Sequence, residues 1–253
     1  MLEELKEQVC SANLALFREG LVTHAWGNAS AVDRKRGVLV INPSEFPYDA
    51  LRPKHMVVVS LSCGAVIDGD LKPTVDTPTH IAIYRAFRKV GGIAHTRSLY
   101  ATAWAQAGQN IPTFGTVQAD HWHGDIPCTR IMTDQEIKRD YEWNTGRLIV
   151  ESFSGIDPLH RPAMLVAGHG PFTWGADVVE AVYNAVVLEF IAKLASKTIR
   201  INPEAKPLQA TLVEKRFQRT HDSRTDHGHD GWPVPKEESP AVADGRVVRF
   251  PNV

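Results

Sequence analysis

Hydrophobic residues recur along the chain at spacings that predict helices separated by short strands. Near the N-terminus, Leu2, Leu5, Val9, Ala12 and Leu16 follow one another at intervals of three and four residues, so they share one face of a helix that stops at Gly20. Further helices are expected from Thr77 to about Gly91, over 98–107, from Thr133 to about Phe153, from Asp177 to about Lys197, and over 207–219. Short apolar runs predict strands over 37–41, 56–60, 93–95 and 164–167.

This mixture of strands and helices predicts a single domain of the α/β or α+β class. From residue 221 onward the sequence becomes polar and rich in proline and glycine, which is typical of an irregular tail. We therefore expect one domain over 1–227 and an irregular C-terminal extension over 228–253.

Composition narrows the class of protein. The chain has 253 residues, 43% hydrophobic and 23% charged, with a formal net charge of −1, which excludes a disordered chain. The balanced charge gives no reason to expect nucleic acid or an anionic membrane as a partner. No apolar run approaches the roughly 20 residues that span a bilayer. The acidic N-terminus is unlike a secretory signal, and three widely spaced cysteines make no disulfide framework, so a cytoplasmic location is expected.

Two histidines stand at the ends of predicted buried strands. His95 ends the run Ile93-Ala94-His95, and His169 follows another strand between two glycines. Imidazole at a strand end is well placed to bind zinc or a similar divalent ion in a cleft. The alternative is that both rings are structural and donate hydrogen bonds to backbone carbonyls.

Acidic residues suggest two further candidate positions. Asp76 precedes Thr77-Pro78, where Thr77 is the expected helix cap, and Asp76 either helps to cap that helix or belongs to a site. Asp120 is followed by His121 and His123. If this segment is a strand, the two histidines face one side and Asp120 the other, which suits a metal. The alternative is a solvated polar loop.

Two short polar segments, Gly27-Asn28-Ala29-Ser30 and Asn42-Pro43-Ser44, are predicted as loops at the ends of strands or helices. Backbone N–H groups of such loops can bind an anion, although most such loops are only turns.

Beyond these local patterns, the chain resembles a known family along most of its length. The matching segments run from residue 2 to about 221 and include Trp26-Gly-Asn-Ala-Ser-Ala-Val-Asp33, Asp76-Thr-Pro-Thr-His80, Trp104-Ala-Gln-Ala-Gly108, Ile126-Pro-Cys-Thr-Arg130, Tyr141-Glu-Trp143 and His169-Gly-Pro-Phe-Thr-Trp-Gly175. On these motifs the chain is identified as a member of the class II (metal-dependent) sugar-phosphate aldolase family, in its L-ribulose-5-phosphate 4-epimerase branch.

The resemblance implies an α/β fold of three layers, with helices covering a central, mostly antiparallel sheet. It also implies a homotetramer with an active site at each subunit interface, and a divalent metal, zinc first of all, held by three histidines. In the family, an enediolate forms as the C3–C4 bond of the ketose breaks, the aldehyde turns, and the bond re-forms with C4 inverted. A Lewis acid beside the developing negative oxygen stabilises it.

The metal ligands match only in part. His95 and His169 correspond to two of the family's three histidines, whereas Arg97 stands at the third position. Arginine stays protonated and cannot ligate a cation. The remaining catalytic positions are also mixed. The resemblance assigns the acid near the metal, the catalytic acid and two polar residues beside it to Asp76, Asp120, Thr116 and Glu142, and it places Arg216 and His227 where the family has a histidine and its catalytic tyrosine.

The family's phosphate-binding residues are eroded in the same way. Asn28 and Ser44 are retained, whereas Asn42 replaces a lysine and Glu45 a glycine. Thr74-Val75 stands in place of a pair of serines. Because a lost lysine and an added carboxylate disfavour a phosphate dianion, the sequence predicts an unphosphorylated or cationic substrate.

Three functions are compatible with this pattern. The first is a diverged aldolase or epimerase acting on a ketose or similar substrate through an enediolate, with His121 or His123 as the third ligand, or with Arg97 in place of the metal. The second is a non-catalytic paralogue that keeps the fold and the oligomer as a binding or structural subunit. The third is an unmodified L-ribulose-5-phosphate 4-epimerase.

Overall fold

Seven strands pair into one sheet in the order β4-β3-β2-β1-β5-β7-β6. The computed structural model describes residues 2–153, 155 and 157–221, and it places all neighbouring strands antiparallel. The strands are β1 (Asn28–Asp33), β2 (Val38–Ile41), β3 (Val57–Ser60), β4 (Val66–Asp68), β5 (Gly92–His95), β6 (Ala163–Val166) and β7 (Gly170–Gly175). This confirms the expected central antiparallel sheet.

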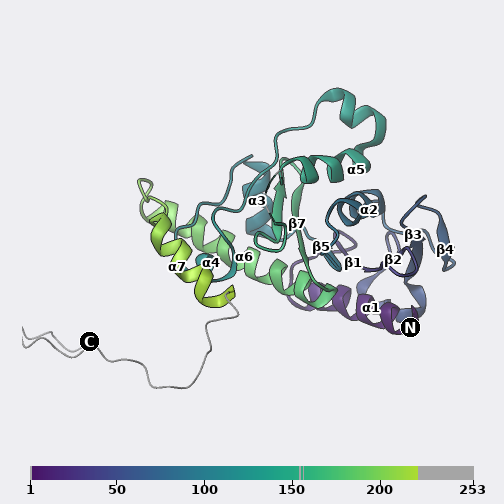
Figure 1. Cartoon of the computed structure of the whole chain (residues 1–253). Helices are drawn as coiled ribbons and strands as arrows, with labels where there is room; N and C mark the ends of the chain where they lie inside the picture. Colours follow the sequence, from purple (N-terminus) through teal and green to yellow (C-terminus); the bar gives the residue numbers. More distant parts are fainter. Residues whose placement is uncertain (1, 154, 156, 222–253) are drawn as a thin grey trace, which may run out of the picture. The chain divides into compact units, whose positions relative to one another are not determined.

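Helices cover both faces of the sheet, which confirms the three-layer α/β class (Figure 1). The helices are α1 (Leu2–Arg18), α2 (Thr77–Ala86), α3 (Leu99–Gln106), α4 (Thr116–His121), α5 (Asp134–Glu151), α6 (Val178–Ile201) and α7 (Ala210–His221), with short 3-10 turns η1 (Tyr48–Ala50) and η2 (Pro53–His55). None of the described helices combines the length and the apolar character that crossing a membrane requires.

Alternate residues of the central strands enter two separate cores. In β2, Val38 and Val40 pack with α1 and α6, whereas Leu39 and Ile41 pack with α2 and α5 on the opposite face. Both faces are therefore buried, which explains why this strand is apolar at every position instead of alternating with polar residues.

The start of α5 follows the predicted capping chemistry. The Thr133 hydroxyl accepts a hydrogen bond from the Glu136 N–H, and the Glu136 carboxylate accepts from the Thr133 N–H, which confirms the capping box. The start of α2 differs from its prediction. Asp76, not Thr77, occupies the cap position, and no side-chain hydrogen bond closes that cap. Thr77 instead donates to the Thr74 carbonyl.

Several elements of the fold are not predicted by the local sequence pattern. The segment predicted as a polar loop over 27–30 begins the central strand β1, whose residues Asn28-Ala-Ser-Ala-Val-Asp33 are too small and polar to form an apolar run. The strand β7 starts with Gly170-Pro171, which is a turn signal in isolation. Residues 116–121 form the helix α4, so a strand with His121 and His123 on one side is wrong.

The described residues up to His221 belong to one compact unit. The proposed domain end at 227 and the extension over 228–253 lie outside the described residues, as does His227.

The contact between α5 and α2 supports a prediction about stability. A Cβ atom at Gly146 would lie 2.6 Å from the Ala82 Cβ and 2.8 Å from the Thr79 carbonyl oxygen. Alanine favours a helix over glycine by about 1 kcal/mol, but overpacking costs about 1–3 kcal/mol. We therefore expect Gly146→Ala to destabilise the fold in urea unfolding. Arg147→Ala, at the exposed neighbouring position, serves as the control and is expected to change stability by no more than about 0.5 kcal/mol.

Candidate metal centre

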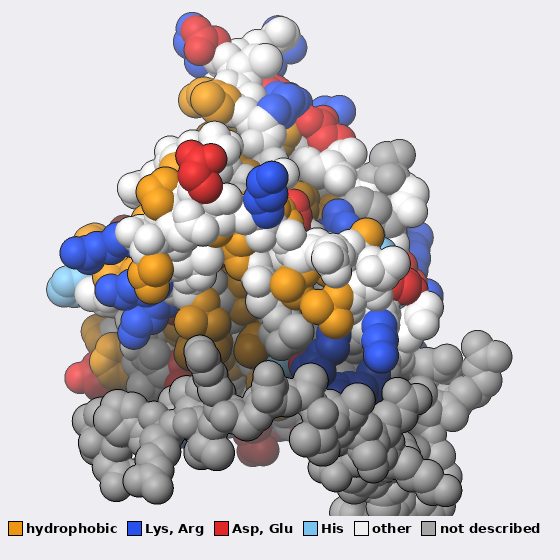
Figure 2. Space-filling model, turned by 90° about the vertical axis from the view of Figure 1, so that its left-hand side faces the viewer, with side chains coloured by type: hydrophobic (Ala, Val, Ile, Leu, Met, Phe, Trp, Pro, Cys, Tyr) orange, Lys and Arg blue, Asp and Glu red, His pale blue; other side chains and the backbone are white. Residues whose placement is uncertain are grey.

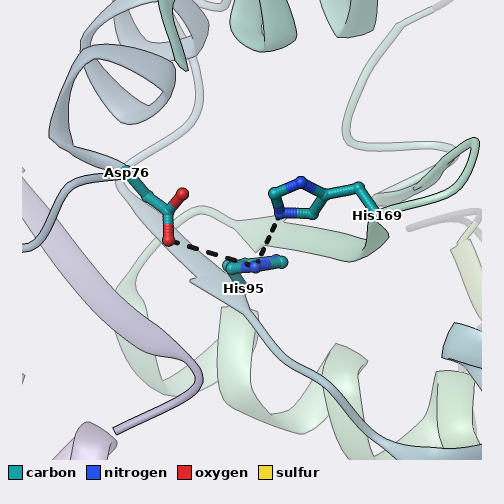
Figure 3. Close-up of side chains that lie close together, drawn as sticks. All are labelled: Asp76, His95 and His169. Carbon is teal, nitrogen blue, oxygen red and sulfur yellow. Dashed lines mark hydrogen bonds and ion pairs between the residues drawn. The ribbon is translucent and has the colours of Figure 1, made fainter. Parts of the chain in front are cut away.

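Three side chains from distant parts of the chain converge beside the sheet. Asp76 lies at the start of α2, His95 ends β5, and His169 lies in the turn before β7 (Figure 3). Their ligating atoms all lie within 4.8 Å of one another. The pairing of β5 with β7, in which His95 is opposite Phe172, brings the two histidines together.

The hydrogen bonds of the two imidazole rings orient their Nε2 atoms toward each other. His95 Nδ1 lies 2.9 Å from the Pro171 carbonyl oxygen, which can only accept, so Nδ1 carries the proton and Nε2 carries the lone pair. His169 Nδ1 lies 2.7 Å from the Tyr141 hydroxyl. The two Nε2 atoms are 3.1 Å apart. Both rings are buried; that of His95 stacks on Phe172, and that of His169 is tilted toward the same ring.

Burial keeps both histidines neutral. It lowers the pKa of His95 to about 3, and the nearby Arg97 charge acts in the same direction. Burial, together with the His95 and Arg97 charges, lowers the pKa of His169 to about 3, against the opposite influence of Asp76. A neutral imidazole is the form that binds a metal.

Asp76 supplies an oxygen to this group and does not cap its helix through its side chain. Its Oδ2 atom accepts a hydrogen bond of 2.7 Å from Asn28 Nδ2 and lies 4.0 Å from His95 Nε2. Asn28 pairs with His95 across β1 and β5, so one backbone register positions both the ligand and the residue that orients Asp76.

These residues fit a divalent metal. Two imidazole nitrogens and one carboxylate oxygen form a donor set found at catalytic zinc sites, where a fourth position is left for water or substrate. A backbone carbonyl such as that of Pro171 is a usual partner of a ligating histidine on its other ring nitrogen, and the Tyr141 hydroxyl occupies the same position on His169. This donor set forms without a histidine at position 97, where the family resemblance implies one.

Arg97 lies beside the group but is turned to the backbone. Its guanidinium donates a hydrogen bond to the carbonyl of His169. Position 97 therefore supplies no metal ligand, as expected, and instead places a fixed positive charge next to the two imidazoles.

The residues related to phosphate binding lie next to Asp76. Asn28 Nδ2 is 3.4 Å from Thr74 Oγ1, and the Thr74 N–H donates to the Asn42 carbonyl over 3.1 Å. The side-chain oxygens of Asn28 and Asn42 are buried and have no hydrogen-bond partner among the described residues. The Ser44 N–H is bound to the Lys72 carbonyl, so it is already occupied.

The other catalytic candidates form a second cluster, between α4 and α7. Asp120 is ion-paired with Arg216, and Arg219 Nη2 lies 3.6 Å from its other oxygen. His121 Nε2 is 2.8 Å from the Tyr183 hydroxyl, and His123 Nε2 is 2.8 Å from Glu214. Among the described residues of a single chain, His121 and His123 therefore do not join His95 and His169. Thr116 begins α4, and Glu142 lies in α5 next to Tyr141.

Tyr141 is the residue of this site that sequence reasoning missed. It follows Asp140, whose φ of −163° and ψ of 70° interrupt the helical conformation of α5. Nothing in the residue spacing predicts this kink, although Tyr141-Glu-Trp143 belongs to a segment that matches the family.

The role of Tyr141 is testable. Tyr141→Phe removes the hydroxyl bound to His169 Nδ1, and loss of such a partner typically weakens metal binding by about 10–100-fold. We expect a weakening in this range when zinc is titrated against a competing chelator. Tyr100→Phe removes a hydroxyl from α3, outside the group of ligands, and is expected to leave zinc affinity unchanged. Equal affinities for Tyr141→Phe and the parent chain would exclude this role.

Comparisons with known proteins agree with this architecture. Residues 7–196 match the family of the class II aldolase and adducin N-terminal domain. An L-ribulose-5-phosphate 4-epimerase, UlaF, from Salmonella paratyphi C is 47% identical over 227 residues, covering 90% of this chain and 99% of the relative. The UlaF of Salmonella choleraesuis matches to the same extent.

Solved structures match the fold. An L-fuculose 1-phosphate aldolase superposes with a TM-score of 0.73 at 20% identity, covering 85% of this chain and 95% of that structure. YgbL from Klebsiella pneumoniae, described as a putative aldolase/epimerase/decarboxylase, has a TM-score of 0.66 at 28% identity, with coverage of 85% and 98%. By its fold and by its relatives along almost the whole domain, the chain belongs to the class II aldolase family.

Proposed function

We propose that this chain is an aldolase- or epimerase-type enzyme that acts on a ketose through an enediolate. The observation that carries the proposal is the group of Asp76, His95 and His169, whose ligating atoms face one another within 4.8 Å. The 47% identity to curated L-ribulose-5-phosphate 4-epimerases supports the same reaction class.

His95, His169 and Asp76 are the proposed ligands, with zinc as the expected metal. A divalent cation held here would supply a Lewis acid for negative charge on a substrate oxygen. Tyr141 and Asn28 position His169 and Asp76 through the hydrogen bonds described above. Arg97, a fixed cation beside the ligands, is proposed to bind an anionic oxygen of the reacting substrate.

Asp120 is the proposed acid–base residue, with Thr116, Glu142 and His227 as further candidates. Since Asp120 is held by Arg216 in a cluster separate from the metal ligands, we propose that it serves the site of a neighbouring subunit.

Apolar side chains are scattered among charged ones on the face that carries α4 and α7 (Figure 2). Exposed residues of α6, such as Phe190 and Leu194, add to the apolar surface available for contact between subunits. We propose a homotetramer in the cytoplasm.

We propose that the part of the substrate that lies near Asn28 and Asn42 carries hydrogen-bond donors and no phosphate group. The side-chain amide groups of Asn28 and Asn42 donate to Asp76 and the Pro43 carbonyl, which fixes their orientation and leaves both side-chain oxygens as acceptors. Glu45 adds a carboxylate in the same loop. A phosphate dianion has only acceptors at neutral pH and is disfavoured by these groups.

Two measurements test the proposal. Elemental analysis of protein purified without chelator or metal-affinity resin is expected to find about one zinc per chain. Turnover is then measured on L-ribulose and on L-ribulose 5-phosphate, and the unphosphorylated sugar is expected to give the higher kcat/KM. Preference for the phosphorylated sugar would overturn the substrate assignment alone, whereas failure with both sugars and with a wider set of ketoses would overturn the reaction.

The second candidate is a non-catalytic paralogue that serves as a binding or structural subunit. The observation in its favour is that both Arg97 and Arg216 stand at positions where the family resemblance implies histidine. It predicts a tetramer that holds no zinc after dialysis against excess metal and that shows no turnover of any ketose.

A further inference from the structure

A cleft of about 580 Å³ lies at the opposite end of β1 and β5 from the metal ligands. Its walls come from α1, from the turn between β1 and β2, and from the segment between α2 and β5. In the β1–β5 pair, Asn28 is opposite His95 at one end and Ala31 is opposite Gly92 at the other. At about 3.3 Å per strand residue, the Gly91 wall of the cleft is about 13 Å from His95.

Positive charge dominates this cleft. Five cationic residues line it, namely Arg34, Lys35, Arg36, Arg88 and Lys89, against the carboxylates of Glu4 and Asp33. Asp33 neutralises Arg36 over 2.6 Å, and Asp157 neutralises Lys89 over 2.7 Å. The side chains of Lys35 and Arg88 are exposed and make no hydrogen bond or ion pair with any residue that the structure describes.

Arg34 is held in place beside these two exposed cations. Its guanidinium donates to the carbonyls of Tyr84, Phe87 and Val90, at 3.1, 2.9 and 2.6 Å. Since a guanidinium has five N–H groups, two remain for another acceptor. Burial lowers the pKa of Arg34, and the positive charge of Arg88 acts in the same direction. Among the described groups, no carboxylate compensates the Arg34 charge.

We propose that this cleft binds a small phosphorylated anion, of the class of phosphate esters and pyrophosphate compounds, with Arg34, Lys35 and Arg88 as its recognition residues. Guanidinium and ammonium groups from two different loops can contact separate oxygens of one phosphate group. The volume lies within the range of small-ligand sites, about 300–1,000 Å³. The site is distinct from the proposed catalytic site and does not depend on the reaction assigned above.

Titration calorimetry with sodium pyrophosphate, at constant ionic strength, tests this site in the full-length protein. We expect about one equivalent bound per chain, and weaker binding of inorganic phosphate because it offers fewer charged oxygens. The double variant Lys35→Ala/Arg88→Ala is expected to weaken pyrophosphate binding at least tenfold, or about 1.4 kcal/mol. The matched control Lys197→Ala/Arg200→Ala removes one lysine and one arginine that are exposed on α6, and is expected to bind as the parent does.

Circular dichroism checks that both double variants fold, and repeating the titration with His95→Asn removes any contribution from a metal at the other site. The proposal is overturned if the parent does not bind pyrophosphate, if the cleft variant binds as tightly as the parent, or if the α6 control is weakened equally. Binding that is lost in His95→Asn and kept in the cleft variant would also overturn it, since the ligand would then occupy the metal centre.

Discussion

Replacing His95 by asparagine is expected to abolish metal binding and to reduce kcat/KM at least a thousandfold. His95 supplies one of the two imidazoles that the described residues bring together here, and its Nε2 atom faces both His169 and Asp76. A thousandfold loss corresponds to about 4.1 kcal/mol, which is in keeping with removal of a Lewis acid that is worth several kcal/mol. Zinc content by elemental analysis and turnover of the ketose measure the two effects.

The same experiment decides what His121 and His123 do. His160→Asn serves as a matched control, because the His160 ring contacts Phe217 and is not among the grouped ligands. If His121→Asn or His123→Asn also releases the zinc, that residue completes the site, and a neighbouring subunit of the proposed homotetramer supplies it. Full zinc content and activity in His95→Asn would refute the proposed metal centre.

Arg97→His is expected to strengthen zinc binding by about 10–100-fold. The change removes a fixed positive charge beside the cation and adds a neutral imidazole as a possible further ligand. Zinc affinity is measured by competition with a chelator of known affinity. Arg97→Ala removes the charge without adding a ligand, so its smaller gain separates the two causes.

Turnover of the same two variants tests whether Arg97 also contacts the substrate. If Arg97 binds a substrate oxygen, both variants lose kcat/KM although they hold zinc more tightly. A rise in activity that parallels the rise in zinc affinity would show that Arg97 only weakens the centre, and weaker zinc binding in Arg97→His would contradict the electrostatic argument itself.

The regular part of the fold was accessible from the sequence because its signals are local. The spacing of Leu5, Val9 and Leu16 predicts α1, and Thr133 with Glu136 predicts the start of α5. In contrast, β1 is buried at the centre of the sheet although its sequence is small and polar. Its burial depends on the two strands that flank it. β2 follows it directly in the sequence, whereas β5 lies far along the chain. No local pattern reports such pairing.

The candidate site was predicted to a similar extent. Their positions at strand ends make His95 and His169 candidate ligands, with structural histidines as the alternative, and the resemblance assigns them as ligands and Asp76 as the acid near the metal. The sequence alone favours capping of α2 by Asp76, but its side chain makes no capping hydrogen bond and accepts one from Asn28 instead, a contact that no local pattern predicts. Tyr141 reaches His169 through a kink in α5, and a kink without proline or glycine leaves no mark in the sequence.

The separation of the ligands along the chain has a consequence for folding kinetics. His95 and His169 are 74 residues apart, and the pairing of β5 with β7 is what brings them together. Such non-local contacts form late, because the entropy of closing a long loop must first be overcome. Zinc present during refolding is therefore expected to leave the folding rate unchanged and to slow unfolding, since it stabilises contacts that are absent from the transition state. The metal would then slow the unfolding of a sheet that folds equally fast without it.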